Sequence, residues 1–327
     1  MKRVFSGVQP SGVIHIGNYL GAIKQWVQLQ RDYEAIYSIV DLHAITLPQK
    51  PEDLSNNIYR SAATYLACGV DPEKSMIFIQ SHRPEHAELA WIINTLTTFG
   101  EMQRMTQFKD KASRFAKASV PLGIFAYPTL MAADILLYQA DVVPVGDDQK
   151  QHVELTRNIA QRFNSRFGQT FVVPEPLLPK AGKRIMSLDN PQNKMSKSAS
   201  SALGYISLTD SAQEISSKIS KAVTDSGNEV VKSESKPAMS NLIDIYALFT
   251  NLTTSDIEKR YAGKTYAVFK KDLTDVLVEK IVPIGNKIKT IEQDKAEVLK
   301  ILKRGADKLA PLAQQTMRDV RAKIGLV

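Results

Sequence analysis

Five residues, Lys194-Met195-Ser196-Lys197-Ser198, place two ammonium groups close together in a serine-rich stretch. A mobile loop with such a lysine pair can follow negative charge as it migrates during phosphoryl or nucleotidyl transfer. A lysine-rich pentamer alone is more often a solvated face of the protein. The pentamer therefore predicts phosphate chemistry only together with a second phosphate-binding element.

A second candidate element lies near the N-terminus, between an apolar run, residues 4–8, and a helical pattern, residues 18–29. Its residues are Pro10-Ser11-Gly12-Val13-Ile14-His15-Ile16-Gly17-Asn18. The glycines let the backbone approach a ligand, while an imidazole, an amide and a helix N-terminus can bind phosphate oxygens. Together, the two elements predict a site for a nucleotide.

In this order the two elements resemble the HIGH and KMSKS signatures of class I aminoacyl-tRNA synthetases. Nearly the whole chain is similar to the bacterial-type tryptophanyl-tRNA synthetases, and the further matching stretches are residues 5–12, 39–44, 104–109, 127–136 and 145–152. Two positions depart from the superfamily pattern. Asn18 replaces the second histidine of HIGH, so the phosphate site does not contain two imidazoles. Ala199 follows Ser198 where an acidic residue is common.

The resemblance implies two reactions: activation of L-tryptophan by ATP to tryptophanyl-adenylate, and transfer of the tryptophanyl group to its tRNA. Attack of a carboxylate oxygen on the α-phosphate depends on positioning and charge stabilisation. The catalytic residues implied are Gln9, His15, Asn18, Lys111, Lys194 and Lys197. The ATP-binding residues implied are Gln9, Pro10, Ser11, Gly17, Asn18, Gly146, Asp147, Asp148, Ile185, Lys194, Met195, Ser196, Lys197 and Ser198. Mg²⁺ is expected to be held mainly by ATP phosphates, with no dedicated protein metal site.

Asp134 is the candidate that decides the amino acid, because it lies in an apolar helical pattern, residues 130–137, where an unpaired carboxylate would be costly. Without the resemblance, it is interpreted as a buried carboxylate satisfied by the backbone or by a cation. The resemblance makes it the acceptor for the indole N–H of tryptophan. The other tryptophan-binding residues implied are Phe5, His43, Tyr127, Met131, Val143, Val145 and Gln149.

The other histidines and the single cysteine have structural interpretations. His82 and His86 flank a helix start, and with no cysteine nearby a zinc site is not favoured. His152 is expected to pack or cap within a helix. Cys68 is expected to be a small core residue, and a lone cysteine excludes an intramolecular disulfide.

Apolar runs alternate with helical patterns through the first two-thirds of the chain. The runs are residues 4–8, 35–40, 76–79 and 142–145, and the helical patterns are residues 18–29, 52–67, 85–99 and 149–163. This order predicts an α/β fold with a doubly wound parallel, Rossmann-like sheet. Pro174, Pro176 and Pro179 are expected to end the sheet pattern. Ligands bind beyond the carboxyl ends of such strands, where the turns at 9–18 and 146–149 fall.

Four regions are predicted along the chain. Residues 1–190 form the catalytic domain with a basic insertion near 101–119, residues 191–210 a mobile loop and linker, residues 211–284 a smaller all-helical domain, and residues 285–327 C-terminal helices that fold back on the catalytic domain. We expect the helical domain to bind the anticodon end of tRNA. Its basic residues are equally compatible with a solvated face: Lys218, Lys221, Lys259, Arg260, Lys264, Lys270 and Lys271.

Composition bounds the partners. Lys plus Arg number 42 against 34 Asp plus Glu, and the net charge of +8 suits a polyanion such as tRNA without requiring one. The sequence lacks a secretory apolar segment and a run of 18 apolar residues, so we expect a soluble cytoplasmic protein without a membrane partner. The resemblance implies a homodimer.

Three other functions fit the sequence less well. Tyrosyl-tRNA synthetase shares the superfamily and an acidic acceptor, but the 146–152 run and the intact lysine pentamer favour the tryptophan family. A non-catalytic RNA-binding paralogue should have lost phosphate-site residues, which are all present here. A small nucleotidyltransferase would not need the C-terminal helical domain.

Overall fold

The computed structural model describes residues 1–10, 12–113, 115, 119–146, 149–178, 184–196 and 201–327, without the side chains of residues 110 and 111. The chain forms two compact units. Unit 1 comprises Met1–Gly12, Trp26–Lys180 and Asp294–Val327, and unit 2 comprises Val13–Gln25 and Ala181–Gln293. The two candidate phosphate-binding motifs, at residues 13–18 and 194–196, therefore belong to unit 2, whereas Asp134 belongs to unit 1.

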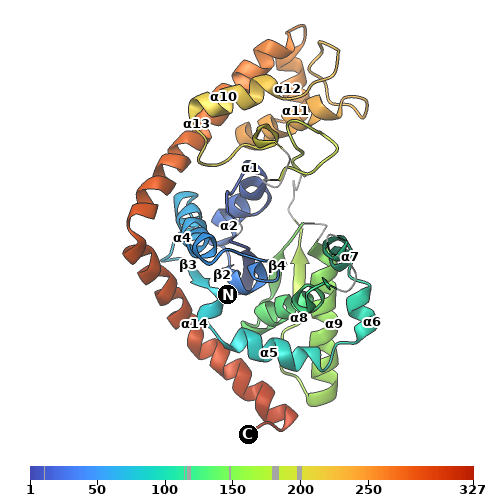
Figure 1. The fold of residues 1–327 in the computed structure, drawn as a ribbon, viewed down its shortest axis with the longest axis vertical. Helices are drawn as coiled ribbons and strands as arrows, with labels where there is room; N and C mark the ends of the chain where they lie inside the picture. The colour runs from blue at the N-terminus through green and yellow to red at the C-terminus, as the bar shows by residue number, and fades with distance from the viewer. Residues whose placement is uncertain (11, 114, 116–118, 147–148, 179–183, 197–200) are drawn as a thin grey trace. The chain divides into compact units, whose positions relative to one another are not determined.

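The described part of unit 1 contains one five-stranded sheet with the order β3-β2-β1-β4-β5, and all of its pairings are parallel (Figure 1). The strands are β1 (Arg3–Val8), β2 (Glu34–Ile39), β3 (Ser75–Ile79), β4 (Val142–Pro144) and β5 (Glu175–Leu177). The predicted doubly wound sheet is confirmed. Its direction of winding reverses between β1 and β4, and the carboxyl ends of strands at such a point are where ligands bind.

The expectation that prolines end the sheet pattern is wrong for Pro176, which lies in β5 opposite Val143. An edge strand tolerates proline because one side of its backbone has no ladder to complete. The segment 175–177 lacks the β-branched residues of the other strands, so its pairing is not visible in the sequence.

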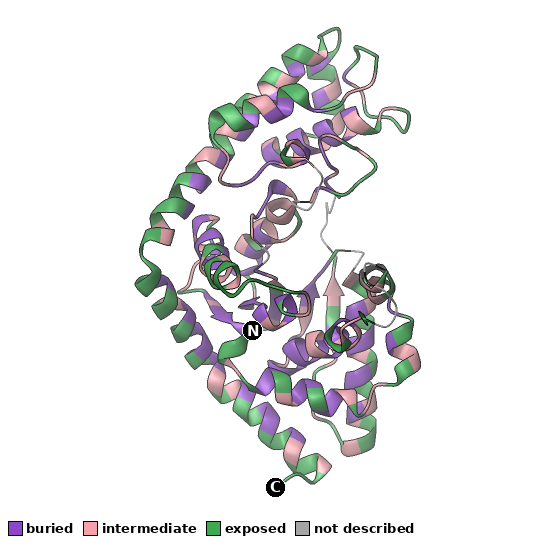
Figure 2. Cartoon of the chain, in the orientation of Figure 1, coloured by how far each residue is buried: buried purple, intermediate pink, exposed green. Residues whose placement is uncertain are grey.

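The helices of unit 1 confirm the predicted alternation, with ends shifted by a few residues. They are α3 (Asp41–Ala44), α4 (Pro51–Ala67), η2 (Gln80–His82), α5 (Glu85–Asn94), α6 (Phe99–Gln103), α7 (Thr106–Ala112), α8 (Leu122–Leu137), α9 (Lys150–Phe167) and α14 (Lys295–Ile324). α14 packs directly on the edge strand β3, since a Cβ on Gly305 would lie 2.0 Å from the carbonyl oxygen of Ile77. A hydrogen-bonded ion pair joins Arg321 Nε to Glu88 Oε1 of α5 at 2.6 Å. Strands β1 to β3 and the inner face of α8 are largely buried (Figure 2).

Unit 2 is helical. Its elements are α1 (Ile16–Asn18), the π-helix η1 (Tyr19–Ile23), the start of α2 (Lys24–Leu29), η5 (Ala202–Gly204), α10 (Ala212–Lys221), α11 (Pro237–Thr250), α12 (Thr254–Tyr261) and α13 (Tyr266–Gln293). Its core contains the packed rings of Tyr246, Tyr261 and Phe269. Among the residues described in either unit, no helix is long and apolar enough to cross a membrane.

Candidate functional site

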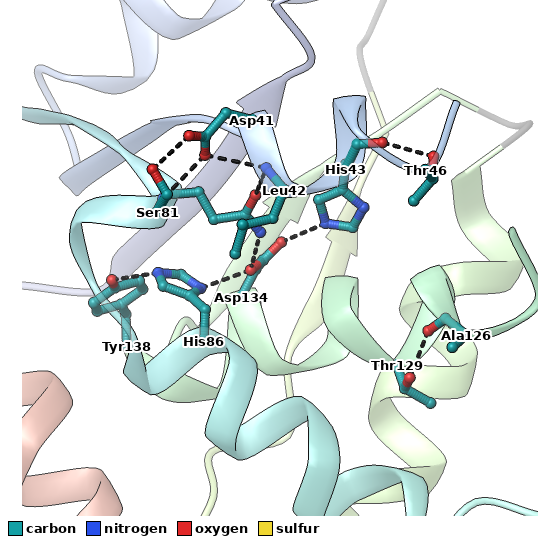
Figure 3. Close-up of polar contacts among 11 residues, drawn as sticks. Asp41, Leu42, His43, Thr46, Ser81, His86, Ala126, Thr129, Asp134 and Tyr138 are labelled. Atoms are coloured by element: carbon teal, nitrogen blue, oxygen red, sulfur yellow. Dashed lines mark hydrogen bonds and ion pairs between the residues drawn. The ribbon is translucent and has the colours of Figure 1, made fainter. Parts of the chain in front are cut away.

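Asp134 lies on α8 with 1% of its surface exposed, and three side chains direct polar hydrogens at its carboxylate (Figure 3). His43 Nε2 is 2.8 Å from Oδ2, whereas Gln80 Nε2 at 2.7 Å and His86 Nδ1 at 2.6 Å both contact Oδ1. These groups come from α3, η2 and α5. A carboxylate oxygen has two acceptor positions, so the described contacts fill Oδ1 and leave Oδ2 one further position.

The Asp134 carboxylate is held in its ionised form. Burial alone would raise its pKa, but the charge and hydrogen bond of His43 and the hydrogen bond and charge of His86 lower it below the ordinary value. An ionised carboxylate only accepts hydrogen bonds, so Nε2 of His43 and Nδ1 of His86 must each carry the donated proton. The structure satisfies the buried carboxylate of Asp134 with side-chain donors of two histidines and a glutamine, and it leaves Oδ2 able to accept one more donor.

The predicted tryptophan-binding residues all lie in unit 1. Phe5, Val143 and Val145 are buried in one hydrophobic cluster, and Met131 packs against that cluster. Tyr127 sits edge-on to the imidazole of His43, with ring centroids 6.3 Å apart, and its hydroxyl is 2.9 Å from His152 Nε2. The structure therefore brings an apolar wall, a buried acceptor and a ring with a polar end into one region, as an amphipathic aromatic ligand requires.

Sequence reasoning missed Gln80 and His86, which are both 0% exposed. His86, predicted to mark only a helix start, binds Asp134 through Nδ1 and Tyr138 Oη through Nε2, at 2.7 Å. For Gln80 a signal existed, because this polar residue directly follows the apolar run of β3 at a carboxyl end. For His86 no signal existed, because its partners are 48 and 52 residues away in the chain.

Several of the remaining unit 1 candidates follow the carboxyl ends of β1 and β4. Gln9 and Pro10 follow β1, Gly146 follows β4, and Gln149 is the residue before α9. Lys111 is within α7, but its side chain is not described. Three predicted residues of this group lie outside the described residues: Ser11, Asp147 and Asp148.

The N-terminal motif starts α1 in unit 2. Nδ1 of His15 accepts from Gly17 N–H at 3.1 Å, and Oδ1 of Asn18 accepts from His15 N–H at 3.2 Å, so the two side chains form a reciprocal cap. Since Nδ1 accepts, the neutral imidazole carries its proton on Nε2. Gly17 is required because a Cβ would lie 2.9 Å from the His15 ring.

The lysine-rich motif begins on a short backbone pairing in unit 2. Met186 and Lys194 form an antiparallel bridge, and Met195 N–H donates to Ile185 O at 3.0 Å. Ile185 and Met195 are buried, and Ser196 is half-buried. A Cβ on Gly17 would lie 3.8 Å from Cβ of Met195, so the two motifs meet within this unit. Lys197 and Ser198 lie outside the described residues.

Known proteins resemble the chain over its full length. The family model "tRNA synthetases class I (W and Y)" matches residues 1–281. The tryptophan–tRNA ligase of Caldanaerobacter subterraneus subsp. tengcongensis is 52% identical over 328 residues, covering 100% of this chain and 99% of that protein. The ligase of Helicobacter pylori strain 26695 is 51% identical, with 100% and 99% covered.

Solved structures agree with these relatives. Tryptophanyl-tRNA synthetase from Mycoplasma pneumoniae superposes with a TM-score of 0.93 at 35% identity, over 100% of this chain and 98% of that one. The Campylobacter jejuni enzyme complexed with ADP and tryptophan gives 0.84 at 36% identity, over 99% and 100%. The chain therefore belongs to the class I tRNA synthetases of the tryptophan and tyrosine family.

Proposed function

We propose that this protein activates L-tryptophan with ATP to tryptophanyl-adenylate and transfers the tryptophanyl group to its cognate tRNA. The observation that carries the choice of amino acid is the remaining acceptor position on Oδ2 of the buried, ionised Asp134. The indole N–H is the single hydrogen-bond donor of the tryptophan side chain, and a buried acceptor rejects a ligand that leaves it unpaired. The relatives that match the full chain are named as ligases for this amino acid.

The tryptophan side chain would lie among the apolar residues beside Asp134. Phe5, Val143, Val145 and Met131 would wall the indole ring, and the N–H would reach Oδ2 beside His43. Tyr127 and Gln149 would hold the α-amino group, which leaves the carboxylate of the substrate directed toward ATP. This arrangement makes binding of tryptophan a task of unit 1 residues.

The phosphates of ATP would be bound mainly by donors of the two motifs. The charge on the triphosphate would be stabilised by the predicted catalytic residues, which are His15 through Nε2–H, Asn18, Lys194, Lys197, Gln9 and Lys111. Among the other predicted ATP residues, Asp147 and Asp148 would accept from ribose hydroxyls, and Ile185 and Met195 would contact the adenine. A Mg²⁺ ion that neutralises phosphate charge would take its ligands mainly from phosphate oxygens and water.

We also propose that residues 211–284 bind the anticodon end of tRNA and that residues 1–190 form the catalytic domain. Two of the basic residues predicted to contact phosphate fit this poorly. Lys218 is 9% exposed and pairs with Asp210 at 2.6 Å, and Lys270 donates to the carbonyl oxygens of Ser220 and Ala222. The exposed candidates on and after α12 are Lys259, Arg260 and Lys264.

A cytoplasmic homodimer is the proposed state. Unit 1 exposes the large apolar side chains Trp91, Phe99 and Leu122, at 70%, 66% and 78%. Phe99 packs on Phe125, one turn after Leu122 in α8, so two of these side chains belong to one apolar area. Exposed apolar areas of this kind are typical of protein interfaces. Sedimentation of the native protein and of a Phe99→Ser variant would test the dimer.

Amino-acid-dependent pyrophosphate exchange tests the proposed activity. With ATP and Mg²⁺, tryptophan should support exchange and tyrosine should not, and tryptophan should then be transferred to tRNA. Exchange with tyrosine instead would assign the protein to the other branch of its family. Binding of tRNA without exchange would identify a non-catalytic paralogue.

A further inference from the structure

His86 and Tyr138 form a buried pair behind Asp134, on the side of Oδ1. His86 is 0% exposed, and its ring is stacked 5.8 Å from Phe78. Its Nδ1 contacts Oδ1 of Asp134 at 2.6 Å, and its Nε2 contacts Tyr138 Oη at 2.7 Å. Tyr138, also 0% exposed, stacks on Phe5, a proposed wall of the indole pocket, with ring centroids 5.9 Å apart. The pair therefore touches both the acceptor and the wall of that pocket.

Resting on the proposed function, we propose that His86, supported by Tyr138, is a positioning residue for tryptophan selection. Its Nδ1–H fixes the rotation of the Asp134 carboxylate and keeps it ionised, so that Oδ2 faces the substrate as an acceptor. Neither residue touches the substrate. They act through Asp134, because Oδ1 is the oxygen they hold and Oδ2 is the oxygen with a remaining acceptor position.

The protonation of His86 and Tyr138 supports this positioning role. Burial, followed by the charge of Asp134, raises the pKa of the Tyr138 hydroxyl well above its ordinary value, so the hydroxyl keeps its proton. It can donate to Nε2 of a neutral His86, or its oxygen can accept from a protonated one. In both states Nδ1 keeps its hydrogen and donates to Asp134. The neutral tautomer with the proton on Nε2 is disfavoured, since it would aim a lone pair at the carboxylate.

Gln80 supports the same oxygen from another element. Its Oε1 accepts from the backbone N–H of Leu42 at 3.1 Å, which orients its amide nitrogen toward Oδ1. Other charged or titratable groups also act on this network. His43 contacts Oδ2 of Asp134, and the charges of the Arg83–Glu85 ion pair act on Tyr138. His86 is thus one of two donors to Oδ1 and the one that can carry a charge.

The test compares tryptophan with its sulfur isostere 3-(1-benzothiophen-3-yl)alanine, which lacks the N–H donor. The ratio of their kcat/KM values in pyrophosphate exchange measures how much the hydrogen bond from the indole N–H to Oδ2 of Asp134 contributes to selection. His86→Leu removes the donor to Oδ1, and His86→Asn keeps an amide N–H near the Nδ1 position. Tyr138→Phe removes the support, and Tyr65→Phe is the matched control, since Tyr65 is equally buried but packs on Trp26.

We expect His86→Leu to lower the ratio by about 10-fold on the acid side of the pH profile, and Tyr138→Phe by about 2- to 5-fold. His86→Asn and Tyr65→Phe should stay within about 2-fold of the unaltered protein. Loss of the donor raises the pKa of Asp134, so the ratio in His86→Leu should recover as the pH rises and the carboxylate ionises again. A purely structural role would not give this recovery.

A well-folded His86→Leu variant with an unchanged ratio would overturn the proposal, and so would a loss of the ratio that does not vary across the pH profile. Failure of the unaltered protein to exchange with tryptophan would instead overturn the proposed function. The hydrogen bond from His86 Nδ1 to Asp134 is then tested by ¹⁵N NMR of histidine-labelled protein. A proton on Nδ1 of His86 that responds to Tyr138→Phe supports the positioning role, and a neutral ring with its proton on Nε2 refutes it.

Discussion

The two candidate regions are held together by different kinds of contact. In unit 1, Asp134 is held by side chains from α3, η2 and α5, which lie far apart in the sequence. In unit 2, the His15 cap is local, and the segment that carries it pairs with the backbone of Ser207. In the proposed function, selection of the amino acid would depend on a buried side-chain network, whereas phosphate chemistry would depend on short motifs. Substitutions in the two regions should therefore change different kinetic constants.

The largest effect is expected in the lysine-rich motif. Lys194→Ala and Lys197→Ala should each lower the rate of adenylate formation by about 100-fold, because the charge they stabilise builds up as pyrophosphate separates. The two losses should not be additive, since both lysines serve one loop. The KM for tryptophan should change little in pyrophosphate exchange. Lys232→Ala, which removes an ion pair with Asp244 in the same unit, is the control. An equal effect on tryptophan binding would give the motif a structural role.

Asp134→Asn tests the other region. The amide replaces the charged acceptor and can turn its NH₂ toward the three donors, so about 1.5 to 3 kcal/mol of selectivity should be lost, or roughly 10- to 150-fold in kcat/KM for tryptophan. The maximal rate with saturating substrate should fall less. Asp256→Asn, a helix cap of α12 in unit 2, controls for the substitution itself. An unchanged kcat/KM in a folded variant would remove Asp134 from the site.

A third prediction compares two helix caps, one in each unit. Glu101 caps α6 with Thr98 and also binds Arg162 at 2.6 Å, whereas Glu214 caps α10 with Ser211 and makes no arginine contact among the described residues. The hydrogen bond from Arg162, against a smaller effect of burial and with help from Thr98, lowers the pKa of Glu101 to about 2 from 4.5.

The stabilisation from Glu101 is present above about pH 4.5, the unfolded-state range, and is lost as the pH falls toward 2. Glu101→Gln should therefore lower the free energy of unfolding by about 1 to 2 kcal/mol at neutral pH, after allowance for solvent screening. The difference from the unaltered protein should narrow in urea titrations at about pH 3 to 4. Glu214→Gln should lower the free energy of unfolding by less than Glu101→Gln does. A loss that does not vary with pH would exclude ionisation of Glu101 as the cause.

The contrast between the regions also explains what the sequence could predict. The parallel sheet was predictable because apolar runs such as residues 35–40 alternate with long helical patterns. The nucleotide motifs were predictable because their residue types are contiguous. The pairing of Pro176 in β5 and the contacts of Gln80 and His86 could not be predicted, because each depends on segments that are distant in the sequence and meet only in the folded protein. Asp134 was identifiable from its apolar surroundings, but its donors were not.

The smallest expected effect concerns tRNA. Lys259, Arg260 and Lys264 are exposed on and after α12, and Arg260 and Lys264 lie 5.7 and 5.3 Å from the centroid of the Tyr261 ring. Neutralising all three to alanine should raise the KM for tRNA several-fold and flatten its salt dependence, because phosphate contacts release counterions. Tryptophan-dependent exchange should remain, since that step needs no RNA. The matched control neutralises Lys300, Lys303 and Lys308, which are exposed on α14 in unit 1. If both triple variants changed the KM for tRNA equally, net charge rather than an RNA-binding surface on unit 2 would be the cause. If pyrophosphate exchange were lost together with tRNA charging, the assignment of these three residues to RNA binding alone would be wrong.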